Sequence, residues 1–185
     1  MGDYIDRGKE SRLVVKKIRE LTENNENVIA LMGNHEDMLI DWYKYGVNML
    51  ECNGYKETMK SYDGYYKDLL SDIHWMENLP LYYETDDCIF VHAGANLMLD
   101  SMKEQRRDVM LWTRDDFYHC FEPVIKKRVV FGHTPTELLT GLDVPVIIGN
   151  CIDIDTGCVF NGKLTAIMID GGKVEYMQTG GKNNE

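Results

Sequence analysis

The sequence predicts an α/β fold, and three observations lead to that prediction. A helix–strand–helix pattern fills residues 10–45. Runs of β-forming residues at 28–32, 88–91 and 128–131 are each followed directly by a polar cluster that contains glycine. The last quarter of the chain alternates short apolar runs with glycine turns, which is typical of short strands.

The predicted helices rest on apolar residues at helical spacing. Within residues 10–24, Val14, Ile18 and Leu21 recur at i, i+4 and i+7 with charged residues between them, which indicates an amphipathic helix. Further helices are expected over residues 35–45 and 65–76, with a short one within 97–105.

The predicted strands are short and bounded by turn residues. A hairpin is expected from Leu81-Tyr82-Tyr83 through the turn at Asp86-Asp87 to residues 88–91, and it would deliver His92 to the sheet edge. Asp170-Gly171-Gly172 has the composition of a second hairpin turn. The other expected strands cover residues 28–32, 128–131, 146–148, 151–154, 164–169 and 174–177.

Length and composition limit the organisation and the partners. The 185 residues, 44% of them hydrophobic, can bury one core, so we expect a single domain over residues 1–179 and a frayed tail over 180–185. The net charge of -11 disfavours nucleic acid and anionic membranes as partners. No apolar stretch reaches roughly 18 residues and no export signal is visible, so a cytoplasmic protein is expected. Five cysteines without C-x-x-C spacing argue against a disulfide framework.

Four polar clusters carry the functional prediction. They are residues 2–8, Gly33-Asn34-His35-Glu36, His92-Ala93-Gly94 and Gly132-His133-Thr134. In an open α/β fold, side chains at the carboxyl ends of strands build the site. Asp, Asn and His together form an oxygen and nitrogen ligand set without thiolate, which suits Mn, Fe or Zn. Arg7 has a planar guanidinium suited to phosphate oxygens, so metal-assisted hydrolysis of a phosphate ester is the predicted reaction.

These clusters, in this order, resemble the phosphoprotein phosphatase family of metal-dependent serine/threonine phosphatases, in its compact bacterial form. They match the family's G-D-x-x-D-R-G, G-N-H-E, H-A-G or H-G-G, and G-H-T motifs. Leu111-Trp112-Thr113-Arg114 looks like the bacterial L-W-x-R, and residues 154–157 and 162–166 resemble the family's last strands. The resemblance implies a calcineurin-like metallophosphoesterase, with two β-sheets packed face to face and helices outside.

The resemblance also implies a metal centre with two divalent ions, Mn first and Fe or Zn otherwise. Asp3 would bridge the two ions. Asn34, His92 and His133 would complete the shell of the second ion.

The remaining cluster residues would serve the reaction itself. Arg7 and Arg114 would clamp the phosphoryl oxygens of the substrate. His35, held by Asp6, would protonate the leaving alkoxide while a metal-bound hydroxide attacks phosphorus in line. A positioned acid of this kind contributes roughly 10²–10⁴ in rate.

The chain departs from the family pattern at its start. The family's G-D-x-H-G motif, which binds the first ion, is not found upstream of Asp3 or elsewhere in the sequence. We therefore expect an N-terminally truncated form that lacks the first strand, binds one ion weakly and turns over phosphate esters slowly.

The leading functional prediction is a phosphatase acting on phosphoserine or phosphothreonine in proteins, or on a small phosphoester. A dinucleoside polyphosphate hydrolase of the same fold is the nearest alternative. The complete Asp6-Arg7-Gly8 favours the protein phosphatase, because dinucleotide hydrolases usually vary there. A catalytically impaired domain with a binding role is the third possibility.

Some polar residues have a simpler structural interpretation. Glu36 is expected to support the start of a helix or a contact behind the metal shell. Asp153 and Asp155 are expected to cap backbone groups. For Arg114 a surface ion pair competes evenly with the phosphate clamp.

Overall fold

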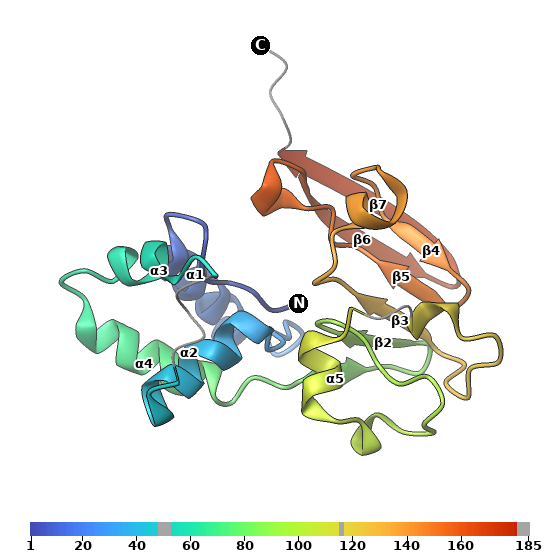
Figure 1. Cartoon of the computed structure of the whole chain (residues 1–185), viewed down its shortest axis with the longest axis horizontal. Helices are drawn as coiled ribbons and strands as arrows, with labels where there is room; N and C mark the ends of the chain where they lie inside the picture. Colours follow the sequence, from blue (N-terminus) through green and yellow to red (C-terminus); the bar gives the residue numbers. More distant parts are fainter. Residues whose placement is uncertain (48–52, 115–116, 181–185) are drawn as a thin grey trace, which may run out of the picture. The chain divides into compact units, whose positions relative to one another are not determined.

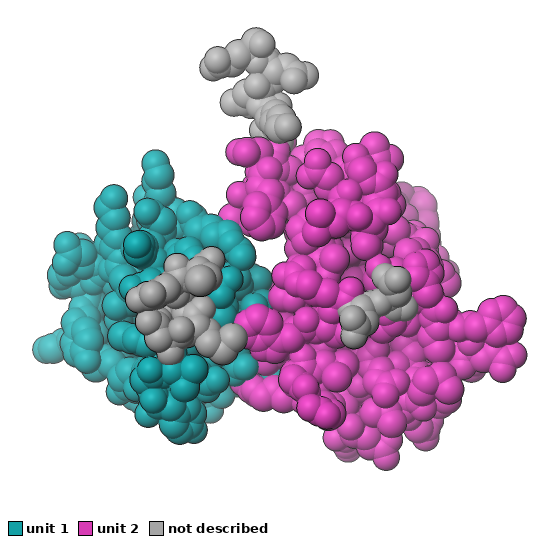
Figure 2. Space-filling view, viewed as in Figure 1, with its two compact units in different colours: residues 1–83 teal, residues 84–185 magenta. Residues whose placement is uncertain are grey.

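The computed structural model describes residues 1–47, 53–114 and 117–180. Two compact units make up the chain, Met1–Tyr83 and Glu84–Glu185 (Figure 2). The expected frayed tail, apart from Gly180, lies outside the described residues.

The first unit is built from helices (Figure 1). They are α1 (Ser11–Asn24), α2 (Asn34–Tyr45), α3 (Tyr55–Ser61) and α4 (Tyr66–Met76). α1 packs on α3 and α4, and α2 packs on α4. Val15, Leu39, Ile73 and Met76 fill the core of this unit, each 1% exposed or less. The predicted helices at 10–24, 35–45 and 65–76 are confirmed, whereas α3 lies in a stretch for which no helix was predicted.

The predicted strand at residues 28–32 is wrong. The segment has no regular secondary structure, and no strand runs beside it among the described residues of this unit. Its backbone N–H groups instead form single hydrogen bonds to separate partners. Leu31 N–H donates to the Tyr4 hydroxyl at 3.0 Å, and Met32 N–H donates to the Pro80 carbonyl at 3.0 Å. Ala30, Leu31 and Met32 are buried but Ile29 is 44% exposed, so the apolar run reports burial only in part, and a strand also requires a partner for its ladder.

A mixed sheet forms the centre of the second unit. Its strands are β1 (Tyr82–Glu84), which lies at the boundary of the units, β2 (Cys88–Val91), β3 (Arg128–Phe131), β4 (Val146–Ile148) and β5 (Cys151–Asp153). The strand order is β1-β2-β3-β5-β4, with β2, β3 and β5 parallel and β4 antiparallel to β5. The central strands are buried on both faces, as parallel strands usually are. The strands predicted from β-forming runs in this half of the chain are confirmed.

A second, antiparallel sheet follows in the same unit. β6 (Lys163–Asp170) pairs with β7 (Lys173–Gly180) through the turn at Gly171-Gly172, where both residues have positive φ, 50° and 98°. Two positive φ angles are what a tight two-residue hairpin requires, so the predicted turn is confirmed.

Short helices complete the second unit: α5 (Arg107–Trp112), α6 (Thr136–Thr140) and the 3₁₀ turns η1 (Met102–Glu104), η2 (Phe117–His119) and η3 (Cys158–Phe160). The expected short helix within 97–105 is the single turn η1. The fold is therefore α/β, with a mixed sheet, a second sheet and helices, as predicted. None of the helices in the described ranges combines the length and apolar character that a membrane span requires.

Candidate functional site

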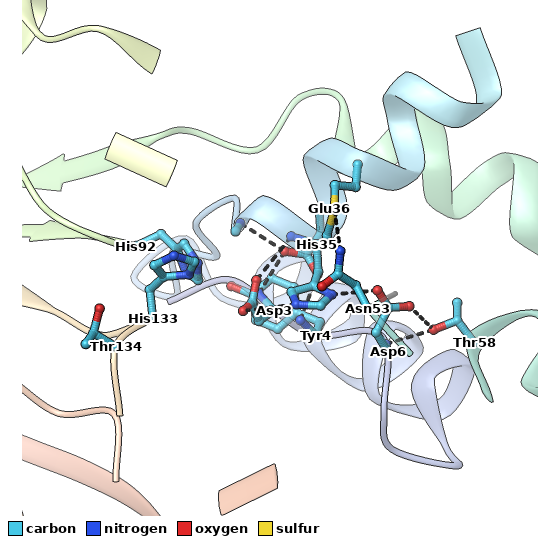
Figure 3. A network of polar contacts seen from close by, with 12 residues as sticks. Asp3, Tyr4, Asp6, His35, Glu36, Asn53, Thr58, His92, His133 and Thr134 are labelled. Carbon is cyan, nitrogen blue, oxygen red and sulfur yellow. Dashed lines mark hydrogen bonds and ion pairs between the residues drawn. The ribbon is translucent and has the colours of Figure 1, made fainter. Parts of the chain in front are cut away.

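The first polar cluster folds back on the start of α2, where Glu36 holds it. The Glu36 carboxylate is completely buried and accepts three backbone N–H groups, from Asp3 at 2.8 Å, Tyr4 at 2.7 Å and Gly33 at 2.9 Å (Figure 3). Burial and the nearby Asp3 charge raise the pKa of Glu36 to about 7, against the effect of these donors. Glu36 thus supports the helix start, as expected, and also fixes the loop that carries Asp3.

That loop has an unusual backbone. Asp3, Asp6 and Arg7 all have positive φ, at 59°, 72° and 60°. Side chains other than glycine rarely adopt this left-handed conformation, which costs roughly 1–2 kcal/mol per residue. Contacts such as those of Glu36 must therefore hold the loop in place.

Asp3 lies against the first turn of α2. Its Oδ1 accepts the His35 backbone N–H at 3.3 Å, and its Oδ2 is 3.9 Å from Nε2 of the His35 ring. Asn34, the first residue of α2, is 3% exposed. The structure therefore brings the first two clusters together within this unit.

Gly33 leaves no room for a side chain beside Asp3. An added Cβ would overlap the Asp3 carboxylate and backbone nitrogen and lie 2.8 Å from Oε2 of Glu36. Its φ of -106° is open to any residue, so the obstacle is steric. We expect Gly33→Ala to lower the free energy of unfolding by roughly 1–3 kcal/mol, measured by urea denaturation.

Gly8→Ala is the matched control for this substitution, because a Cβ there meets only the Asp6 carbonyl at 3.8 Å. Equal stability of the two variants would contradict the steric explanation.

His35 and Asp6 form a buried pair. Nδ1 of His35 lies 2.6 Å from Oδ2 of Asp6, and both side chains are at most 3% exposed. Burial of the ring works to lower the pKa of His35, but the Asp6 hydrogen bond and the charges of Asp3 and Asp6 outweigh it and raise the pKa. The pairing fixes the ring and favours its cationic form, which is the form an acid catalyst needs.

Arg7 follows on the same loop. Its backbone N–H donates to the Gly54 carbonyl at 3.2 Å, and the residue is exposed. Gly54, with φ of 89°, permits this approach because a Cβ there would overlap the Arg7 backbone.

In the second unit, His92 and His133 lie at the carboxyl ends of the neighbouring parallel strands β2 and β3. Gly132 N–H donates to the His92 carbonyl at 2.9 Å, which ties the two strand ends together. Nε2 of His92 lies 3.2 Å from Nδ1 of His133, and the residues are 3% and 8% exposed (Figure 3). Two imidazole nitrogens on one tetrahedral zinc ion would lie about 3.3 Å apart, so the pair fits a shared divalent cation.

Arg114 lies beside the same cluster. Its Nη1 donates to the His133 carbonyl at 2.7 Å and lies 3.5 Å from the Thr134 hydroxyl. These contacts tie an exposed guanidinium to the loop that carries His133.

Asp153 and Asp155 cap backbone groups, as expected. Oδ1 of Asp153 accepts the Asp155 N–H at 2.9 Å, and Oδ1 of Asp155 accepts the Gly157 N–H at 3.0 Å. Asp153 is 1% exposed, and burial raises its pKa to about 8 despite the hydrogen bond it accepts.

The pKa of Asp153 gives a pH-dependent prediction. An unfolded chain releases the Asp153 proton near pH 3.9, whereas the folded state keeps it up to about pH 8. Below pH 4 both states are protonated and the buried side chain carries no charge. As the pH rises toward 8, ionisation favours the unfolded state, so the free energy of unfolding falls. We expect Asp153→Asn to stabilise the protein by about 2–4 kcal/mol at pH 8 and to give no gain at pH 4. Urea unfolding at both pH values measures this, with the exposed Asp170→Asn as control. The same effect at both pH values would refute the explanation.

Residues 1–167 match the family described as calcineurin-like phosphoesterase. The chain therefore belongs to the calcineurin-like phosphoesterase family and is a metallophosphoesterase. This agrees with the fold class and with the metal-dependent phosphoester hydrolysis predicted from the clusters.

Individual proteins of the family are similar to this chain over most of its length. The chain is 29% identical over 189 residues to bis(5'-nucleosyl)-tetraphosphatase PrpE (asymmetrical) of Anoxybacillus flavithermus (strain DSM 21510 / WK1), covering 90% of this chain and 73% of the relative. It is also 29% identical over 185 residues to the protein of that name from Oceanobacillus iheyensis, covering 90% and 71%. A crystal structure of a putative diadenosine tetraphosphatase shares the fold, with a TM-score of 0.63 at 18% identity, over 99% of this chain and 79% of that one. These names agree with the predicted alternative better than with the leading prediction of a serine/threonine phosphatase.

Proposed function

We propose that the chain is a metal-dependent hydrolase of dinucleoside polyphosphates. The similarity to bis(5'-nucleosyl)-tetraphosphatases over 90% of the chain carries this proposal. A small phosphoester substrate also agrees with the net charge of -11, which disfavours polyanionic macromolecules. We further propose that the two units act together as one catalytic domain over residues 1–179.

Divalent metal ions belong to this proposal. The ligands would be the oxygens of Asp3 and Asn34 and the imidazoles of His92 and His133, a set that suits Mn, Fe or Zn. The 3.2 Å separation of the two histidine nitrogens supports it. When bound, such ions lower the pKa of water and neutralise charge on the phosphoryl group.

The other cluster residues would bind and protonate the substrate. Arg7 and Arg114 would donate hydrogen bonds to phosphoryl oxygens, for which a guanidinium is well shaped. His35, with its Nδ1 bonded to Asp6, would deliver a proton from Nε2 to the leaving oxygen. A phosphoanhydride releases a phosphate oxygen, which needs this proton less than an alkoxide does.

Turnover of two substrates by the purified chain with added Mn tests the proposal. We expect diadenosine tetraphosphate to be hydrolysed with a kcat/KM at least about tenfold above that of a phosphoserine peptide, a difference of roughly 1.4 kcal/mol in transition-state binding. Product analysis distinguishes asymmetrical cleavage, to ATP and AMP, from symmetrical cleavage to ADP.

A higher kcat/KM for the phosphoserine peptide than for diadenosine tetraphosphate would contradict the proposal and support a serine/threonine phosphatase instead. Metal binding in calorimetry without turnover of either substrate would favour the impaired, binding domain. The matched control is His74→Asn, an exposed histidine outside the clusters, which should leave kcat/KM unchanged.

A further inference from the structure

A buried hydroxyl on α3 contacts Asp6 on the side away from His35. Thr58 is 1% exposed. Its Oγ1 accepts the Asp6 backbone N–H at 2.7 Å and donates to Oδ1 of Asp6 at 2.6 Å. The other carboxylate oxygen, Oδ2, holds Nδ1 of His35 at 2.6 Å. Thr58, Asp6 and His35 therefore form one continuous line of hydrogen bonds (Figure 3).

The single hydroxyl proton of Thr58 goes to Asp6. The other acceptor within reach, Oγ of Ser11, is farther away at 3.2 Å and itself donates to the Gly8 carbonyl at 3.3 Å. An ionised carboxylate at 2.6 Å is the stronger acceptor, and charge-assisted bonds of this kind are about twice as strong as neutral ones.

The two bonds from Thr58 act on different parts of Asp6. One holds the backbone, whose φ of 72° lies in the left-handed region, and the other holds the carboxylate plane. Without the hydroxyl, neither the strained backbone nor the rotation of the carboxylate would be fixed from this side. Because Oδ2 is hydrogen-bonded to Nδ1 of His35, a rotation of the carboxylate would also reorient the imidazole ring.

We propose that Thr58 is a positioning residue for the acid His35, acting through Asp6, so that the three side chains work as a triad. The proposal rests on the proposed function of His35 as the proton donor. Thr58 itself contacts no reacting atom. It belongs to α3, outside the four clusters, and it would set the direction in which Nε2 presents its proton.

Thr58→Val and Thr58→Ser test this proposal as a matched pair. Valine keeps the shape and removes the hydroxyl, whereas serine keeps the hydroxyl. We expect Thr58→Val to lower kcat on phenyl phosphate about 10–100-fold, within the range available to an acid catalyst. The loss on para-nitrophenyl phosphate, whose leaving group needs little protonation, should be less than about threefold. KM should stay within about twofold, and Thr58→Ser should restore kcat.

A purely structural role would not discriminate between leaving groups. Equal losses on both substrates, or no loss on either, would overturn the proposal. His35→Asn is measured beside these variants. If His35→Asn reduces kcat equally on both substrates, His35 is not the proton donor and both proposals fail. If His35→Asn depends on the leaving group and Thr58→Val does not, only the proposed role of Thr58 fails.

Proton NMR of the full chain gives a readout that needs no turnover. The short bond between His35 and Asp6 should give a strongly downfield Nδ1–H signal, identified by its loss in His35→Asn. We expect this signal to persist in Thr58→Ser and to shift upfield or broaden in Thr58→Val. An unchanged signal in a folded Thr58→Val protein would contradict the triad.

Discussion

His35→Asn should reduce kcat on phenyl phosphate by roughly 10²–10⁴, the contribution of a positioned acid. The asparagine amide can occupy the place of Nδ1 and keep the bond to Asp6, so the substitution removes only the proton at Nε2. On diadenosine tetraphosphate the loss should be less than about tenfold, since a phosphate oxygen leaves more easily. Steady-state kinetics at neutral pH with added Mn measure both values.

His74→Asn serves as the control here too, because His74 is exposed, its Nδ1 faces Glu77 at the surface, and it should not affect kcat. Similar losses on the two substrates would show that His35 contributes something other than a proton.

Glu36→Ala should give the largest loss of stability. The substitution leaves three backbone N–H groups without their acceptor, those of Asp3, Tyr4 and Gly33. Each unsatisfied buried donor costs about 1–3 kcal/mol, so we expect a total loss of about 3–5 kcal/mol after relaxation. Urea unfolding measures it, and metal binding should weaken with it because the Asp3 loop is released.

Two variants bracket this result. Glu36→Gln keeps the shape but turns an amide NH₂ toward one of the donors, so it should lose less than Glu36→Ala. Glu26→Ala, at an exposed position, should stay within about 0.5 kcal/mol of the parent protein. A Glu36→Ala protein as stable as Glu26→Ala would show that the three hydrogen bonds do not hold the loop.

Much of the fold could be predicted because apolar spacing reports burial. The helix at 10–24 and the strands at 88–91 and 128–131 were predicted nearly to the residue. The same spacing says nothing of pairing partners, which is why the apolar run at 28–32 was wrongly predicted as a strand. The helix α3 is too short for its apolar positions to form a pattern.

In the candidate site, too, some contacts could be predicted from the sequence and others could not. The meeting of His92 and His133 follows from sequence, because the carboxyl ends of neighbouring parallel strands share one edge. The contacts of Glu36 with Asp3 and of Thr58 with Asp6 join residues 33 and 52 positions apart. Neither separation has a local signature, so only the folded chain reveals them.

The relatives' names favour the alternative substrate class over the one that Asp6-Arg7-Gly8 predicted, and there is a chemical reason why this motif discriminates poorly. Asp6-Arg7-Gly8 favoured a protein phosphatase in the sequence analysis. An arginine that binds a phosphoryl group, however, contacts only this group, which phosphoproteins and dinucleoside polyphosphates share. Discrimination must come from groups that touch the rest of the substrate, and no motif in the sequence marks these.

The Tyr4 hydroxyl accepts the Leu31 N–H of the segment at 28–32. Tyr4 is also one of the donors to Glu36, so the opening loop, the extended segment and the start of α2 share one set of contacts. These three stretches should unfold together as one cooperative unit. In hydrogen–deuterium exchange, the amides of Asp3, Tyr4 and Leu31 should therefore exchange at a common rate, and anything that loosens Tyr4 should expose all of them at once.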